Sequence, residues 1–220
     1  KFQMHIAEEE TLKDAPSPDY FKKENRFEYF KRINFSIKDW KKIKQYCKTK
    51  KIGFLCSPFS IKAVDILERL NVEIYKVPSG ELTNLPLLQR LKKTNKHVII
   101  STGMSDYREI NQAVKILRKK LFILQCTSMY PCPIEKAGVN VFDNLKKKYN
   151  FEIGYSDHTL DFSSAFAFAA KGASIIEKHF TLSKKLYGSD AKHSMEEKDF
   201  KFYVNTIKDI WKINKSFVDK

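Results

Sequence analysis

The stretch that decides the fold is EIGYSDHTLDFSSAFAFAAKGASIIEKHFT, residues 152–181. It begins with a short apolar run at 152–157, continues with helical spacing at 165–170 and ends with a second apolar run at 174–181. Short runs of this kind, rich in β-branched and aromatic residues, are typical of strands. The stretch therefore predicts a strand, a helix and a second strand parallel to the first.

The same alternation runs through the whole chain. Strands are expected at residues 1–5, 53–58, 73–77, 97–102, 122–128, 152–157 and 174–181, and helices at 37–47, 61–70, 107–117 with Ser105 as N-cap, 165–170 and 200–213. Strict alternation over so many units favours a (β/α)8 TIM barrel over an open doubly wound sheet. Because seven strands are found where a barrel needs eight, we expect one domain over residues 1–220 whose first strand precedes Lys1.

Residues 7–34 break this rhythm. They contain Pro16, Pro18 and many charged side chains, and they are long for a connection between a strand and a helix. We expect this segment to cross the barrel mouth or to contact a second copy of the chain.

The composition excludes several classes of protein. Hydrophobic residues make up 42% and aromatic residues 13%, which is enough for a core and argues against a disordered chain. No run approaches the roughly 20 apolar residues of a membrane helix, and no signal peptide begins the chain. The four cysteines form no C-x-x-C pair, so we expect reduced thiols in a soluble, cytoplasmic protein.

The charge balance is strongly basic. The chain has 41 Lys and Arg against 26 Asp and Glu, a formal net charge of +15, but the excess is mostly Lys spread along predicted helices. A nucleic-acid-binding protein would gather these cations on one face with aromatic residues between them. The dispersed charge therefore predicts neither a nucleic-acid nor a membrane partner.

Polar side chains gather where the predicted strands end. They are Ser57, Lys76, Ser79, Glu81, Ser101, Thr102, Thr127, Ser128, Tyr130, Asp157, His158 and His179. The carboxyl ends of barrel strands converge on one face, where active sites are built. Any single hydroxyl here can equally be a helix cap, so the accumulation of polar residues is the signal.

Two kinds of site are conceivable at these strand ends. His158 and His179 lie one strand–helix unit apart, so they can form a two-histidine metal site with positions open for water or substrate; the alternative is two hydrogen-bonded structural histidines. Lys76 with the serines that end neighbouring strands suits a small phosphorylated anion, unless it is simply solvated there. No Walker or G-x-G-x-x-G loop is present, which argues against nucleotide binding.

At these same residues the chain resembles the sialic acid synthase family, which includes N-acetylneuraminate, legionaminic, pseudaminic and spore-coat relatives. The matching blocks are Lys1-Phe2-Gln3, Ser57-Pro58-Phe59, Tyr75-Lys76-Val77-Pro78-Ser79-Gly80-Glu81, Thr83-Asn84-Leu85-Pro86, Ser101-Thr102-Gly103-Met104, Gln125-Cys126-Thr127-Ser128-Met129-Tyr130-Pro131, Gly154-Tyr155-Ser156-Asp157-His158-Thr159 and Ile176-Glu177-Lys178-His179-Phe180-Thr181. They run in order across most of the chain.

The resemblance implies a reaction. Such enzymes condense phosphoenolpyruvate with the open-chain aldehyde of an N-acylated amino sugar, giving a nine-carbon α-keto acid and phosphate. It implies that His158 and His179 hold a divalent cation, Mn2+ first and Mg2+ or Co2+ as alternatives, and that the active protein is a homodimer. By the same matching, phosphoenolpyruvate would be surrounded by Lys1, Ser57, Lys76, Ser79, Ser101, Ser128 and Ser156, and the sugar would be contacted by Gln3, Tyr130 and Asp190. Glu81 would be a further polar or catalytic neighbour.

The chain also departs from the family pattern. The carboxylate on the family's first strand and the C-terminal antifreeze-like domain, which lends an arginine to the partner subunit, are missing from these residues. Residues 187–194 differ from the commoner Gly-Pro-Asp run, so the sugar is left open. Two alternatives remain: a synthase of the octulosonate or heptulosonate phosphate type, and a catalytically incomplete fragment that only binds.

Overall fold

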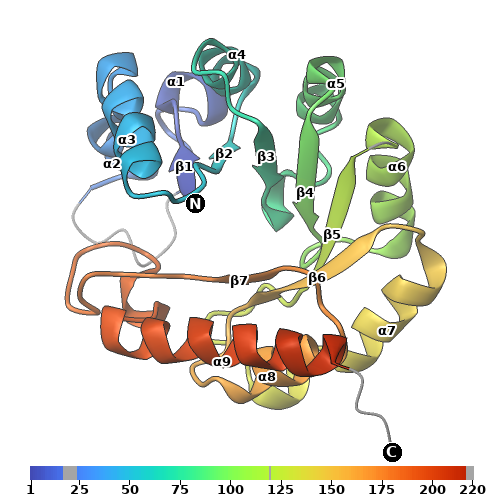
Figure 1. Cartoon of the computed structure of the whole chain (residues 1–220). Coiled ribbons are helices and arrows are strands. Elements are labelled where there is room, and N and C mark those ends of the chain that lie inside the picture. Colours follow the sequence, from blue (N-terminus) through green and yellow to red (C-terminus); the bar gives the residue numbers. More distant parts are fainter. Residues whose placement is uncertain (17–23, 119, 217–220) are drawn as a thin grey trace, which may run out of the picture. The chain divides into compact units, whose positions relative to one another are not determined.

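The computed structural model describes residues 1–16, 24–118 and 120–216. The chain forms two compact units, coloured along the sequence in Figure 1. The first unit comprises Lys1–Ile100 and Ser105–Leu121, and the second comprises Ser101–Met104 and Phe122–Lys220. We describe each unit by itself.

The first unit contains parallel strands in sequence order. They are β1 (Phe2–Met4), β2 (Cys56–Pro58), β3 (Ile74–Val77) and β4 (His97–Ser101), whose last residue belongs to the second unit. Gln3 pairs with Ser57, so these two polar residues lie at the same height on neighbouring strands, while Lys76 pairs with the apolar Ile99. The helices are α1 (Ala7–Glu10), α2 (Arg26–Ile33), α3 (Ile37–Thr49), α4 (Ile61–Arg69), α5 (Leu85–Thr94) and α6 (Tyr107–Leu117), with the 3-10 helix η1 (Ser79–Glu81) after β3.

The N-terminus of α6 differs from the prediction. The N-cap is Asp106, whose carboxylate accepts hydrogen bonds from the backbone N–H groups of Arg108 and Glu109, while the Glu109 side chain accepts from the Asp106 N–H. This reciprocal capping box satisfies more of the helix's first amide groups than Ser105 alone could. The prediction of Ser105 as N-cap was therefore wrong by one residue.

The segment 7–34 contains α1 and α2, which the periodicity of the sequence did not predict. Ala7, Phe27 and Phe30 form a small buried cluster, and the His5 ring stacks between Phe30 and Phe59 at centroid distances of 4.1 and 4.0 Å. These contacts give the segment a small core of its own. Its expected role at the barrel mouth or at a subunit contact stays a prediction, and Pro18 lies outside the described residues.

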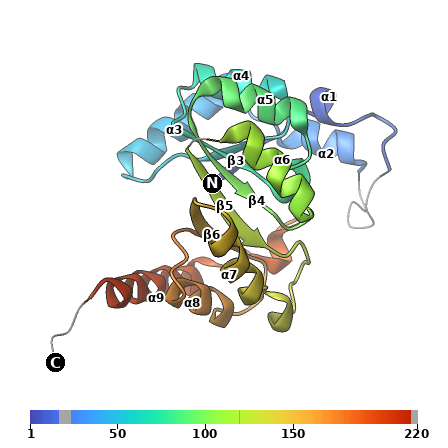
Figure 2. The ribbon, with the colours of Figure 1, turned by 90° about the vertical axis from the view of Figure 1, so that its right-hand side faces the viewer.

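The second unit continues the pattern with parallel strands in sequence order. They are β5 (Leu121–Cys126), whose first residue belongs to the first unit, β6 (Glu152–Asp157) and β7 (Ile176–Lys178). The helices are α7 (Val139–Lys148), α8 (Ser163–Ala170) and α9 (Glu197–Lys215), with 3-10 helices η2 (Ile134–Lys136) and η3 (Ala191–His193). Helices α8 and α9 pack side by side (Figure 2). Their interface contains Ala165, Ala169, Tyr203 and Ile207, and the Tyr155 ring of β6 stacks on Phe168 of α8 at 3.7 Å.

Every predicted strand is present, although several are shorter than their apolar runs. Parallel strands in sequence order, alternating with helices, confirm an α/β fold of the (β/α)8 barrel type with seven of its strands in the described residues. The assignment of residues 1–220 to one domain stays a prediction. None of the helices in the described part of the chain is long and apolar enough to cross a membrane.

Candidate functional site

The carboxyl ends of β6 and β7 build the core of the site in the second unit. The two strands pair in parallel, with Ser156 opposite Glu177 and Asp157 opposite Lys178. Because side chains alternate between the faces of a strand, Ser156 and Glu177 share one face and Asp157 and Lys178 the other. On the first face, the Ser156 hydroxyl donates a hydrogen bond of 2.9 Å to Glu177 Oε2.

His158 and His179 follow these strand ends and lie close together, as predicted. Their ring centroids are 5.5 Å apart at an interplanar angle of 40°. His158 Nδ1 lies 3.0 Å from the Thr127 carbonyl oxygen, so Nδ1 carries the hydrogen and Nε2 the lone pair that a metal ion needs. His179 Nδ1 lies 3.5 Å from Asp190 Oδ2. An oxygen acceptor beside the Nδ1 atom of each imidazole is the usual outer shell of a metal-binding histidine.

Tyr130 completes this face of the site. Its ring lies 4.2 Å from the His158 ring and 6.0 Å from the His179 ring, measured between centroids. The side chain is 47% exposed, so one part of it is packed and another is accessible to a ligand. Tyr130 therefore lies where a residue that contacts the substrate of a two-histidine site is expected.

The surroundings of His158 shift the pKa of its imidazole in two opposite directions. Burial, the largest influence, lowers the pKa of this imidazole. The hydrogen bonds with Cys126 and Thr127 and the charge of Glu177 act in the opposite direction and leave the pKa above its usual value. Cys126 Sγ lies 3.7 Å from His158 Nδ1. A cation binding at Nε2 would therefore compete with a proton.

The end of β4 approaches the end of β5 closely within the second unit. The backbone N–H and the hydroxyl of Thr102 both donate to the Leu124 carbonyl, and Ser101 is buried beside them. A β-carbon on Gly103 would lie only 2.4 Å from Ser128 Oγ. Glycine is therefore the residue that allows the predicted ligand residues Ser101 and Ser128 to lie on closely packed loops.

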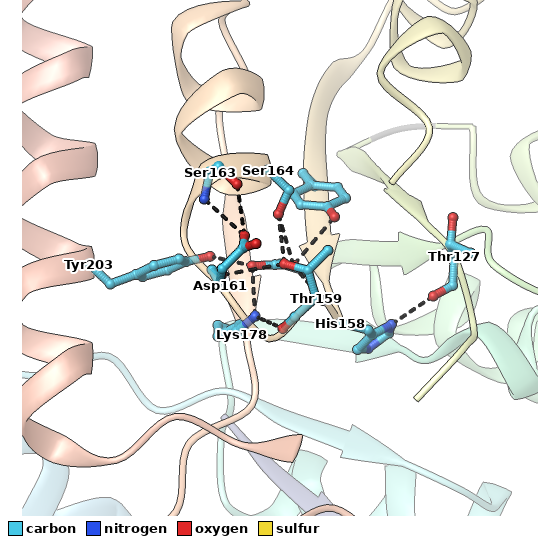
Figure 3. A network of polar contacts seen from close by, with 10 residues as sticks. Thr127, His158, Thr159, Asp161, Ser163, Ser164, Lys178 and Tyr203 are labelled. Carbon is cyan, nitrogen blue, oxygen red and sulfur yellow. Dashed lines mark hydrogen bonds and ion pairs between the residues drawn. The ribbon is translucent and has the colours of Figure 1, made fainter. Parts of the chain in front are cut away.

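A buried polar network surrounds Asp157, the residue before His158, and its members Thr159, Ser164, Lys178 and Tyr203 are labelled in Figure 3. Its carboxylate forms an ion pair of 2.8 Å with Lys178 Nζ, and the two side chains are 0% and 2% exposed. The carboxylate also accepts hydrogen bonds from Thr159, from Ser164 of α8 and from Tyr203 of α9. Proximity to Asp157 and burial raise the pKa of the Tyr203 phenol, with burial the larger cause, so this hydroxyl stays a donor.

In the first unit, Ser57 and Lys76 are the predicted ligand residues with the clearest geometry. Ser57 Oγ is buried and has no hydrogen-bond partner among the described residues, which is unusual for a hydroxyl and leaves it available to a ligand. The Lys76 side chain is buried as well, at 1% exposure, and its Nζ donates 3.1 Å to the Val77 carbonyl. A buried ammonium group is a costly feature that an anionic ligand would offset.

The remaining predicted residues of the first unit are less enclosed. Lys1 and Gln3 lie on or beside β1 and are exposed, while Ser79 and Glu81 belong to η1. Glu81 Oε2 accepts a hydrogen bond of 2.8 Å from Asn84 Nδ2. Burial is the main cause that raises the pKa of the Glu81 carboxyl, and the nearby charge of Glu10 acts in the same direction.

The second unit thus brings together the predicted residues Ser128, Tyr130, Ser156, His158, His179 and Asp190 in one neighbourhood of strand ends. Sequence reasoning gave no role to Cys126, Glu177, Lys178 or the Thr127 carbonyl, which contact or adjoin the histidines. The signal available was adjacency: Lys178 and Asp157 each precede a candidate ligand by one residue.

The donor set fits a divalent cation held by two protein ligands. No group of three or more His, Cys, Asp or Glu side chains suited to a metal ion is found among the described residues. His158 and His179 are the residues of these types that could hold a cation. Two imidazole nitrogens with open positions suit a catalytic rather than a structural metal.

Comparison with known proteins agrees with this fold. Residues 1–219 match the NeuB family. An uncharacterised protein of Methanocaldococcus jannaschii is 42% identical over 191 residues, covering 85% of this chain and 57% of its own length. The N,N'-diacetyllegionaminic acid synthase of Campylobacter jejuni is 37% identical over 195 residues, covering 86% and 58%.

A solved structure matches the whole chain. The N-acetylneuraminic acid synthetase of Leptospira borgpetersenii, in complex with citrate, superposes with a TM-score of 0.86 at 30% identity, covering 100% of this chain and 75% of that one. The structure places the chain in the class of α/β proteins with a barrel-type fold and polar residues at the strand ends. Within that class, the chain belongs to the NeuB family. It spans about 57–58% of the length of the two curated relatives described above.

Proposed function

We propose that this protein takes part in the condensation of phosphoenolpyruvate with the open-chain aldehyde of an N-acetylated amino sugar. In this reaction C3 of phosphoenolpyruvate forms a bond to the aldehyde carbon, water adds at C2, and the resulting tetrahedral intermediate expels phosphate. The product is a nine-carbon α-keto acid of the sialic acid type. Candidate sugars are N-acetylmannosamine and related dideoxy-diacetamido hexoses, because relatives are named as legionaminic, pseudaminic and N-acetylneuraminate-9-phosphate synthases.

The observation that carries the proposal is the pair His158 and His179 in a chain of the NeuB family. Each imidazole has its Nδ1 atom beside an oxygen, the Thr127 carbonyl for His158 and the Asp190 carboxylate for His179. We assign both Nε2 atoms as ligands of a divalent cation, with Mn2+ the first choice. When bound, the cation would polarise the aldehyde oxygen as a Lewis acid.

The protein's own residues would orient the reactants. Tyr130, beside both histidines, would contact the sugar, and Asp190 would orient the His179 ring in addition to any sugar contact. The buried Lys76 ammonium and the unpartnered Ser57 hydroxyl would bind the anionic groups of phosphoenolpyruvate. Lys1, Gln3, Ser79, Glu81, Ser101, Ser128 and Ser156 remain proposed substrate neighbours.

We also propose cytoplasmic localisation and a homodimer. The four cysteines carry thiols rather than disulfides, and three of them are buried, which suits a reducing compartment. The dimer rests on the family resemblance, and sedimentation velocity of the purified chain would test it. The proposed small-molecule partners are phosphoenolpyruvate and the amino sugar.

Phosphate release is the measurement that tests this function. The chain is incubated with phosphoenolpyruvate, Mn2+ and one member of a panel of N-acetylated mannose, bacillosamine-derived and altrose-type sugars. Sugar-dependent release that a chelator abolishes and Mn2+ restores is the expected result. Release only with phosphorylated, non-acetylated sugars would instead identify an octulosonate or heptulosonate phosphate type of synthase.

A fragment that only binds gives a different result in the same assay. It would show saturable binding of phosphoenolpyruvate by calorimetry and no release with any sugar. Release that requires no sugar, or that persists unchanged in His158→Ala, would overturn the proposed reaction.

A further inference from the structure

The buried network around Asp157 and Lys178 has no part in the proposed chemistry, although these two residues precede the two candidate ligands in sequence. Asp157 ends β6 and is followed by His158, and Lys178 ends β7 and is followed by His179. The strands pair so that Asp157 lies opposite Lys178. The two histidines are therefore the residues that directly follow the two members of the ion pair, one on each strand.

The ion pair is directed away from the face that carries Ser156 and Glu177. Its carboxylate accepts hydrogen bonds from Ser164 Oγ of α8 at 3.2 Å and from Tyr203 OH of α9 at 3.2 Å. These donors lie in the helix layer, as Figure 3 shows, so the pair is enclosed between the strands and the helices. A group in this position cannot contact a substrate at the histidines.

Both charged groups form hydrogen bonds with Thr159, the residue after His158. Asp157 Oδ1 accepts from the Thr159 N–H at 2.9 Å and from the Thr159 hydroxyl at 2.8 Å. Lys178 Nζ donates to the Thr159 carbonyl. The carboxylate belongs to the residue before His158 and binds the residue after it. This hydrogen bond fixes the backbone turn that carries the imidazole. Lys178 links the same turn to the strand that presents His179.

The cost of this arrangement argues for a role beyond packing. Two fully buried charges lose their hydration, and apolar residues of similar volume often replace such pairs without loss of stability. In some proteins a buried pair of this kind is retained because it specifies one arrangement. Here the arrangement that it specifies is the separation and direction of two imidazoles.

We propose that the Asp157–Lys178 ion pair is a positioning element that holds His158 and His179 at the separation a shared cation requires. This inference rests on the proposed function, because that function assigns the cation to the histidines. Asp157 and Lys178 are positioning residues: they act through the Thr159 backbone and touch neither cation nor substrate.

Mn2+ affinity without substrate is the first test, measured by calorimetry on the 220-residue chain. We expect Asp157→Asn and Lys178→Met each to raise the Mn2+ dissociation constant by about tenfold or more, the usual range for outer-shell partners of metal ligands. Tyr203→Phe removes one donor to the carboxylate and should produce a smaller rise. The matched control is Asp143→Asn, which removes a surface ion pair of 2.8 Å with Lys171 in the same unit and should leave the constant within about twofold.

The double variant Asp157→Leu with Lys178→Met separates positioning from stability. It removes both charges together and leaves neither one unpaired, so we expect its melting temperature to fall by less than the two single variants' decreases combined. It also removes both contacts to the Thr159 backbone. We therefore expect the double variant to bind Mn2+ as weakly as the single variants do. A double variant that melts normally and binds Mn2+ with unchanged affinity would overturn the inference. If either single variant fails to fold, Tyr203→Phe and the double variant still decide the question.

Histidine nitrogen NMR keeps this inference distinct from the proposed function. In the unchanged chain we expect His158 to show one Nδ1-protonated tautomer, held by the Thr127 carbonyl, and in Asp157→Asn a mixture of tautomers. If the unchanged chain binds no Mn2+, the metal assignment fails, and these spectra decide the positioning role alone: a mixture supports it and unchanged spectra overturn it. Suppose instead that Mn2+ binds and that its affinity depends on the ion pair, but that phosphate is not released from phosphoenolpyruvate with any sugar. The proposed reaction then fails and the positioning role stands.

Discussion

Replacing Gly103 by alanine adds one methyl group where the residues after β4 pack tightly against the end of β5 in the second unit. The new β-carbon would lie 2.4 Å from Ser128 Oγ, 2.7 Å from Cys126 Sγ and 3.0 Å from the Ser128 backbone nitrogen. The serine hydroxyl can rotate away, but the cysteine is buried and the backbone nitrogen moves only with its chain. One of the two loops must therefore shift.

The size of the effect follows from this overpacking. An extra methyl group in a packed region costs about 1–3 kcal/mol of unfolding free energy. For a chain of this size, each kcal/mol lowers the melting temperature by roughly 2–4 °C, so a decrease of roughly 2–12 °C is expected. Ser128 follows Thr127, whose carbonyl holds His158 Nδ1, so a shift of this loop should also weaken Mn2+ binding.

Gly53→Ala is the matched control for differential scanning calorimetry. No atom lies within 4 Å of a β-carbon built at Gly53, so the same substitution meets open space there. It should leave the melting temperature unchanged or raise it slightly, because alanine reduces the freedom of the unfolded chain by about 0.4–1 kcal/mol. Equal melting temperatures for the two variants would refute the close-packing argument. Normal Mn2+ binding by a destabilised Gly103→Ala would refute the coupling to His158.

Three further predictions concern single side chains. Replacing His158 or His179 by alanine should abolish phosphate release that depends on Mn2+, and near-normal turnover after chelation and metal re-addition would contradict the ligand assignment. Lys76→Ala should raise the KM for phosphoenolpyruvate about tenfold or more, since a hydrogen bond to a charged group contributes about 1.5–3 kcal/mol; an effect on the sugar KM alone would assign Lys76 to the sugar. Burial raises the pKa of the Cys56 thiol to about 12, so it stays protonated at mildly alkaline pH, and iodoacetamide should modify the half-buried Cys47 first. Mass spectrometry of the alkylated peptides checks this order, and equal rates would contradict it.

The sequence by itself determined the succession of strands and helices and the gathering of polar residues at strand ends. Both are local properties. The apolar run of β6 predicts a strand, and the polar residue His158 follows that run directly. The blocks around His158 and His179 also carried the family assignment, which the match over residues 1–219 confirmed. Local patterns did not predict α1 and α2, whose apolar faces meet only when the segment folds on itself.

Tertiary structure alone decided what surrounds the two histidines. Nothing near Asp157 in the sequence indicates that Tyr203, 46 residues away on α9, donates to its carboxylate, or that Lys178 neutralises it. The direction of the Asp157 side chain follows from strand alternation, but the donors that it meets depend on how α8 and α9 pack against β6. A buried charge is stable only when such distant partners converge on it, and convergence in space is a property of the packed layers rather than of any stretch of sequence.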